Sequence, residues 1–321
     1  MPGSPIARRS AKHSLSHPKS EISFAEKRLA VPLRGAKEGG VNKRIALAPV
    51  ATLSVPSTGW RVTLFRVLAA LIGLVYLPGA LLMAAPWAPS GMAASLPKLS
   101  PLIWAFAHAT HPDIQRWTFA LSASVDEAIA VILFSLAWRP LRRPLLLQFL
   151  AFAFVVALGA NIPFTGLGII VAYSPLLFVL VAYPELRRLL TPIWRGRMNW
   201  TLLGLALVVG AFFIPQVWRA FQAQIQGTDA VALSFGWAST VEHLGNLWLI
   251  ALFAAFRQPG STLLAVVVAV GLLYLGVAAI SIPGNPGSWG IAGGAIAILG
   301  GVTYIAVIAN ARRRASPPAS G

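Results

Sequence analysis

Long apolar stretches separated by short polar breaks run from residue 59 almost to the end of the chain. Each stretch is long enough, or nearly so, to cross about 30 Å of hydrocarbon as a helix. The pattern therefore predicts an all-α fold, a polytopic membrane helix bundle with eight transmembrane helices. The predicted spans are residues 62–85, 115–138, 144–161, 165–183, 199–218, 236–256, 261–281 and 289–309.

Basic residues fall almost entirely on one side of this predicted topology. Of the 26 Lys and Arg residues, 23 lie at the termini, in the even-numbered connections or, for Arg66, near the start of the first span; the exceptions are Lys98, Arg116 and Arg219. This is the positive-inside distribution, so both termini are expected in the cytoplasm. The topology accounts for the formal net charge of +17, and we expect no nucleic-acid partner.

Two predicted spans carry similar acidic motifs, which suggests an internal duplication. Ser-Val-Asp-Glu at 124–127 corresponds to Thr-Val-Glu-His at 240–243, and Asn-Ile-Pro at 161–163 corresponds to Ser-Ile-Pro at 281–283. Because four spans are an even number, the two copies would face the same way, as a parallel 4+4 repeat. The proposed four-helix membrane units are residues 59–190 and 191–311.

The motifs place four ionisable side chains inside the hydrocarbon zone, and these form the candidate ligand- or proton-binding site. They are Asp126, Glu127, Glu242 and His243. Asp126 and Glu242 each precede a cytoplasmic arginine by roughly 20 Å of helix, so both fall at similar depth in the outer half of the membrane. Such groups are expensive in a bilayer core. They either relay protons or bind a cation or polar ligand, or they form a hydrogen-bonded network that joins two helices.

A long outer loop contains the weak metal-site candidates His108, His111 and Asp113. The spacing of the two histidines places both imidazoles on one face of a helix. A metal site usually needs a third or fourth fixed donor, so solvated side chains are the alternative interpretation.

Other chemistry is limited by composition. The chain has no cysteine, which excludes disulfides, iron–sulfur clusters and thiol catalysis. It has no phosphate-binding glycine loop or hydrolase motif, and a haem would need facing axial ligands within the bundle. We therefore expect no cofactor, and the sequence disfavours an enzyme without excluding one.

Small residues and prolines mark packing features within the spans. Gly290, Gly294 and Gly301 predict a face of the last span that packs closely on a neighbouring helix. Pro78 and Pro215 occupy corresponding spans of the two proposed units, where a proline is expected to kink the helix.

Polar sequence at both ends lies outside the spans. Residues 1–58 are rich in Ser, Pro and basic side chains, which predicts a disordered cytoplasmic tail that contacts anionic lipid. A transit peptide is the alternative interpretation. A further hypothesis is that residues 1–40 are untranslated leader, because Lys-Glu at 37–38 can be encoded by a ribosome-binding sequence and Val41 by a GTG start. Residues 312–321 would form a second cytoplasmic tail.

Each proposed unit has an acid in its second helix, then an apolar stretch and an arginine-bearing turn. In this it resembles the DoxX-like membrane family, as a fused tandem of two family units. The residues that carry the resemblance are Asp126 or Glu127 with Arg139, and Glu242 with Arg257. The resemblance implies a protein of the bacterial cytoplasmic (inner) membrane, sometimes associated with quinone-linked redox systems.

Three functions fit these features. One is a proton-linked permease or small-ligand-binding protein that uses the intramembrane acids. Another is an accessory or assembly subunit of a membrane complex, in which the acids are structural. The third is a quinone-binding oxidoreductase subunit. The expected partners are the lipid bilayer and either an unknown small solute or a membrane protein.

Overall fold

The structure is a computed structural model, and within its described residues the chain is all-helical. One isolated β-bridge joins two connections, and the described segments contain no strand. The described residues are 59–88, 114–185 and 197–315. The basic tail and the metal candidates His108, His111 and Asp113 lie outside these residues.

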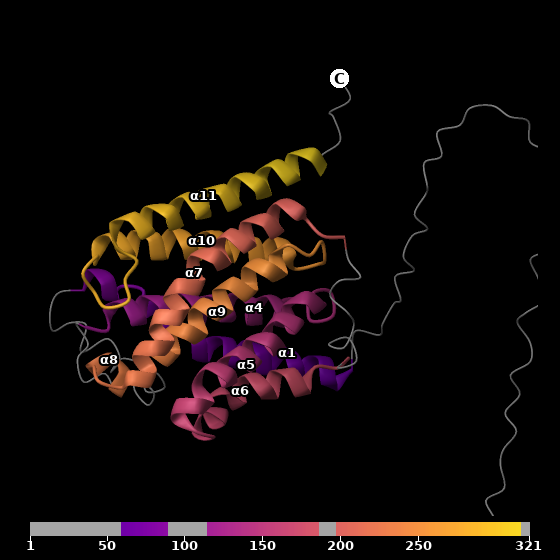
Figure 1. The fold of residues 1–321 in the computed structure, drawn as a ribbon. Coiled ribbons are helices and arrows are strands. Elements are labelled where there is room, and N and C mark those ends of the chain that lie inside the picture. Colours follow the sequence, from indigo (N-terminus) through magenta and orange to yellow (C-terminus); the bar gives the residue numbers. More distant parts are fainter. Residues whose placement is uncertain (1–58, 89–113, 186–196, 316–321) are drawn as a thin grey trace, which may run out of the picture. The chain divides into compact units, whose positions relative to one another are not determined.

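A helix occupies each of the eight predicted ranges (Figure 1). Short helical turns follow the first of them and precede the sixth. The elements are α1 (Trp60–Tyr76), α2 (Gly79–Leu82), η1 (Ala85–Trp87), α4 (Arg116–Trp138), α5 (Pro144–Thr165), α6 (Gly168–Ala182), α7 (Trp200–Gln226), α8 (Ala230–Leu233), α9 (Gly236–Ala254), α10 (Ser261–Ser281) and α11 (Gly290–Ala315).

Six helical segments of the described residues are long and apolar enough to cross a membrane, which fits a multi-pass membrane protein. Two of the eight predicted spans are not among them. Helix α6 has 15 residues, short of the ~20 that a hydrocarbon core needs. Helix α9 carries Glu242, His243 and Asn246, which lower its hydropathy. The eight-span topology therefore stays a prediction.

Large apolar side chains are exposed on the outer faces of these helices. Val155 on α5, Phe178 on α6 and Leu299 on α11 are 63%, 62% and 66% exposed. Soluble monomers rarely present so much contiguous apolar surface. A lipid environment removes the cost of this exposure, so the surface agrees with the span assignment.

Two helix boundaries differ from the predicted ones. The first predicted span is broken at Pro78: α1 ends at Tyr76, and the chain continues as α2 and η1. Pro215 instead lies within α7, which runs on to Gln226 rather than ending near residue 218. Helix α7 stops where Gly227 takes a positive φ of 65°, a conformation that favours glycine at a helix C-terminus.

The arginine-bearing connections meet at one end of the bundle. The Arg257 amide donates to the Arg197 carbonyl at 2.9 Å, which joins the chain before α7 to the chain after α9. The Tyr183 hydroxyl, just after α6, donates to the Pro140 carbonyl between α4 and α5 at 3.2 Å. These three connections are the ones that the predicted topology places on the same side.

The remaining connections meet at the opposite end. The Trp117 amide at the start of α4 donates to Asn285 Oδ1, between α10 and α11, at 3.0 Å. The Trp87 indole N–H donates to Ser281 Oγ at 2.9 Å, so the end of η1 lies beside the end of α10. The connections joined by these contacts lie at alternate ends, as in the predicted topology.

Contacts between helices follow the same scheme in the two halves of the sequence. In the first half α1 packs on α4 and on α6, and α5 packs on α6. In the second half α7 packs on α9 and on α11, and α10 packs on α11. Across the halves α4 contacts α9 and α10, while α5 contacts α9.

Helices α10 and α11 lie side by side and approach each other through small residues (Figure 1). A Cβ added at Gly294 would lie 2.6 Å from the Gly276 carbonyl oxygen, and one added at Gly301 would lie 2.8 Å from the Ala269 carbonyl oxygen. The predicted packing face is thus confirmed for Gly294 and Gly301. Gly290 has open space beside it and takes no part.

A substitution at this contact should separate the two helices. We expect Gly294→Ala to lower the free energy of unfolding by about 1–3 kcal/mol, because the new methyl would lie 2.6 Å from the Gly276 carbonyl oxygen and 2.7 Å from Ile280 Cγ1, and the backbone cannot move aside as a flexible side chain can. Gly300→Ala on the same helix is the control: its Cβ would meet Leu272 at an ordinary 3.5 Å. Thermal unfolding in lipid nanodiscs measures both variants, and equal losses would contradict the packing assignment.

Candidate functional site

Glu242 is a buried carboxylate that joins three helices. It lies on α9 with 4% of its surface exposed. One of its oxygens accepts a hydrogen bond from Asn161 Nδ2 on α5 at 2.7 Å, and the other accepts one from the Tyr173 hydroxyl on α6. Two donors offset much of the cost of burying the carboxylate. The position of Glu242 is therefore held from two neighbouring helices.

His243, the next residue, points toward α4. Its Nδ1 lies 2.5 Å from the Ser239 carbonyl oxygen and 3.0 Å from Ser239 Oγ. Ser239 Oγ in turn lies 3.4 Å from Ser122 Oγ on α4. An Nδ1–H that donates to the carbonyl leaves Nε2 as the acceptor nitrogen. Within the described part of the chain Nε2 has no hydrogen-bond partner, so it is available for a proton or a ligand.

Asp126 is the partner acid on α4, and it lies close to the polar groups of α9. Its carboxylate interacts electrostatically with His243, favourably, and with Glu242, unfavourably. It also packs on the start of α2, where a Cβ added at Gly79 would lie 3.0 Å from Asp126 Cβ. No residue that the structure describes donates a hydrogen bond to this carboxylate. Asp126 and Glu242 thus share one polar region but differ in how firmly they are held.

Glu127 faces a different neighbour from Asp126, as expected for adjacent positions about 100° apart on a helix. Its carboxylate interacts with the backbone amide of Ala80 in α2. Its Oε1 is buried, with no partner among the described residues. The structure therefore associates Asp126, Glu242 and His243 with one another, whereas Glu127 contacts the broken end of the first span.

Several residues of this region were missed by the sequence analysis as functional candidates. Asn161 was noted only as part of the repeated Asn-Ile-Pro sequence. No feature of the sequence indicated that Tyr173 would donate to the same carboxylate. Tyr76 lies at the end of α1, the helix that packs on α4, which carries Asp126. A polar side chain within an otherwise apolar span was the one available signal for all three.

Asn246 extends the polar face of α9 by one helical turn. It is only 1% exposed, and its Oδ1 has no hydrogen-bond partner in the described segments. A spacing of four residues from Glu242 and three from His243 places it on the same side of the helix. We call Asp126, Glu242, His243 and Asn246, with Tyr76, Asn161 and Tyr173, the acidic cluster.

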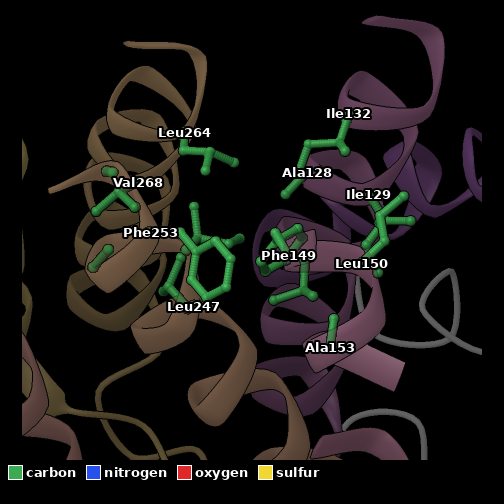
Figure 2. Close-up of a cluster of buried hydrophobic side chains, with 14 of the residues drawn as sticks. Ala128, Ile129, Ile132, Phe149, Leu150, Ala153, Leu247, Phe253, Leu264 and Val268 are labelled. Atoms are coloured by element: carbon green, nitrogen blue, oxygen red, sulfur yellow. The ribbon is translucent and has the colours of Figure 1, made fainter. Parts of the chain in front are cut away.

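A layer of apolar side chains separates the acidic cluster from the arginine-bearing end of the bundle. Figure 2 shows Ile129 of α4, Leu150 and Phe149 of α5, and Leu247 and Phe253 of α9 gathered in this layer. The rings of Phe149 and Phe253 meet edge to face, with centroids 6.1 Å apart. Each helix that carries a cluster residue here turns apolar within one or two turns. The cluster is therefore closed toward that end.

The described residues include no group of three or more His, Asp or Glu side chains close enough to hold a metal ion. The loop histidines that could form a different metal site lie outside the described residues.

Comparison of the chain with protein-family models, with curated proteins and with solved structures finds no match. The DoxX-like resemblance therefore stays a prediction. The function has to be argued from the acidic cluster itself.

The hydrogen bond between Tyr173 and Glu242 should be measurable as a coupling energy. We expect Tyr173→Phe and Glu242→Gln each to reduce stability, and the double variant to lose about 1–2 kcal/mol less than the sum. Tyr274→Phe is the matched control, since that hydroxyl donates to the Met83 carbonyl. It should show no coupling to Glu242→Gln. If the stability losses of Tyr173→Phe and Glu242→Gln simply add in thermal unfolding, the hydrogen bond between these two residues does not contribute to the cluster.

Proposed function

We propose that this chain is a proton-linked permease or small-ligand-binding protein of a bacterial inner membrane. Its site would be the acidic cluster, with Asp126, Glu242 and His243 as the groups that exchange protons or contact the solute. The observation that carries the proposal is the burial of Glu242 and His243 on α9, the helix that packs against α4 and its Asp126. Intramembrane ionisable groups gathered away from lipid are typical of ion and solute pathways.

The three groups suit a cycle in which a proton and a solute exchange. Two hydrogen-bond donors hold the Glu242 carboxylate in place. The Asp126 carboxylate and His243 Nε2 have no hydrogen-bond partner among the described residues. A proton on Asp126 would lower the negative charge of the region, and its loss would restore the attraction for a polar solute. The apolar layer around Phe149 and Phe253 favours access from the opposite end of the bundle.

We further propose that the helices form a parallel repeat of two four-helix units and cross the membrane eight times. The support is that corresponding helices make corresponding contacts: α1 with α4 as α7 with α9, and α5 with α6 as α10 with α11. The acid-bearing helices α4 and α9 then meet at the boundary between the units. Substrate sites of repeat-built transporters commonly lie at such a boundary.

The remaining predictions fit the same proposal. A DoxX-like tandem would place Asp126 with Arg139 in one unit and Glu242 with Arg257 in the other. The basic tail, which lies outside the described residues, would contact anionic lipid on the cytoplasmic side.

One observation favours a second candidate, an accessory or assembly subunit of a membrane complex, quinone-linked or otherwise. The hydrogen bonds of Glu242 tie α9 to both α5 and α6, as a purely structural network would. On that account the acid holds helices together and no solute binds. The two candidates predict different effects of replacing an acid by its amide: the transport candidate predicts a loss of solute current, and the structural candidate predicts a loss of stability.

Solute-dependent currents in proteoliposomes separate the candidates. We expect at least one solute from a panel of neutral, anionic and cationic compounds to give a current on a solid-supported membrane. Glu242→Gln and Asp126→Asn should reduce it about 100-fold, because a charge that is paired or solvated by the ligand is lost. Reconstituted amount and helical content should stay near those of the unaltered protein.

Asp229→Asn is the matched control for this experiment. Asp229 caps α8, where it accepts hydrogen bonds from the Ala232 amide at 2.6 Å and from the Trp237 indole. It makes the same carboxylate-to-amide change outside the acidic cluster, and the current should persist. If no solute gives a current and the cluster variants only lose stability, the structural candidate replaces the transport proposal.

The proposed orientation can be tested by single-cysteine labelling, because the natural chain has no cysteine. Thr228→Cys, after α7, and Arg142→Cys, between α4 and α5, both fall at exposed positions. We expect a membrane-impermeant maleimide to label the first variant in intact cells and the second only after permeabilisation. Labelling of both from the same side would refute the topology.

A further inference from the structure

We propose that the solute is an organic ammonium ion, a protonated amine, and that Asn246 Oδ1 accepts a hydrogen bond from it. This inference rests on the proposed function and names its ligand class. The juxtaposition that carries it is an unpartnered amide oxygen one helical turn from the fixed carboxylate of Glu242.

Asn246 is the observation that points to a missing partner. It is almost fully enclosed, at 1% exposure, and its oxygen has no donor in the described part of the chain. An unsatisfied buried acceptor costs about 1–3 kcal/mol, so such groups are rare unless something fills the vacancy during function. A leucine at this position would pack in the same apolar run of α9 without that cost. Asn246 instead places a hydrogen-bond acceptor at this position.

Carboxylates supply the negative charge of the region, and the donors Asn161 and Tyr173 are already engaged with Glu242. Asp126 comes from α4. Glu242 comes from α9, and its two oxygens already accept hydrogen bonds from α5 and α6. The one cationic candidate is His243, whose Nδ1 is occupied by Ser239. No lysine or arginine within the described residues pairs with these carboxylates. An anion would be repelled here, and a cation with N–H donors would satisfy both the charge and the amide oxygen.

The spacing of the acceptors favours an ammonium group over a bare metal ion. A metal ion needs several oxygen or nitrogen ligands within about 2.0–2.6 Å of one point. The described residues contain no cluster of three acidic or histidine side chains that tight. An alkylammonium ion carries up to three N–H donors on a larger body, so it can contact the Asn246 oxygen together with a carboxylate one helical turn away.

The tyrosines at the cluster agree with an organic cation. The Tyr173 hydroxyl on α6 donates to Glu242, and Tyr76 lies at the end of α1, which packs on α4 and α6. Aromatic rings beside carboxylates attract ammonium groups and also contact the alkyl part of an amine. A small hydrated metal ion would gain little from such neighbours.

The test is amine binding to the full chain in lipid nanodiscs, measured by isothermal titration calorimetry. The probes are propylammonium and the diammonium putrescine, with propanol as the neutral analogue, propionate as the anion and sodium chloride as the metal arm. We expect only the ammonium probes to bind. Asn246→Leu should weaken binding about tenfold or more, because it deletes the proposed acceptor. The same variant should keep or raise the melting temperature.

Tyr304→Phe is the matched control. The Tyr304 hydroxyl on α11 is another buried group with no partner among the described residues. Its removal should likewise keep or raise the melting temperature, but amine affinity should not change. This pair separates the loss of a ligand contact from the general effect of deleting an unsatisfied polar group.

The outcomes distinguish the ligand class from the wider proposal. Binding of propanol, propionate or sodium that depends on Glu242, without amine binding, would overturn the ammonium assignment and leave the solute-binding proposal standing. Amine binding that survives Asn246→Leu would overturn the role of Asn246. Absence of binding by every probe, with a higher melting temperature for Asn246→Leu, would mean that only water occupies the site and would overturn the ammonium assignment.

Discussion

The burial of carboxylates in a layer that contains no bulk water is the constraint on which this structure depends. Glu242 could not remain charged in such a layer without donors, and Asn161 and Tyr173 supply them from two different helices. Because Glu242 needs both donors, α5 and α6 are held against α9 at the depth of this carboxylate. Elsewhere the helices pack through small residues or aromatic edges, which specify position less sharply than a bonded acid.

Helix α9 shows how polarity and burial are combined. It contacts α4, α5, α7 and α10, so it is enclosed by protein on most sides, and its polar residues avoid lipid. Its sequence would be costly as a lone helix in a bilayer, since Glu242, His243 and Asn246 all lie within it. The surrounding helices, which present Val155 and Leu299 to the outside, provide the apolar surface that α9 lacks. Membrane compatibility is therefore a property of the bundle and not of each helix.

Much of this architecture could be predicted from apolar length alone. Runs of about twenty apolar residues permit few structures besides a helix, so the helices fall in the predicted ranges. The acids were also visible, because a charge in such a run stands out. Their partners were not: Asn161 and Tyr173 lie on other helices, and no periodicity within one helix reveals which side chains face each other across a gap. A kink at Pro78 was predicted from the proline itself, whereas the contacts of α2 with α4 after it are found only in the tertiary structure.

The two acidic motifs are alike in sequence but unlike in environment, and this difference bears on the proposed transport function. Glu242 receives a hydrogen bond from Asn161, whose counterpart in the other proposed unit is Ser281. Ser281 instead accepts from Trp87 and donates to the Val277 carbonyl, so it is not available to Asp126. One acid is consequently fixed and the other has no donor among the described residues. A fixed charge beside an exchangeable one is what a coupled site needs, because only one of the two groups then has to change its proton when the solute enters.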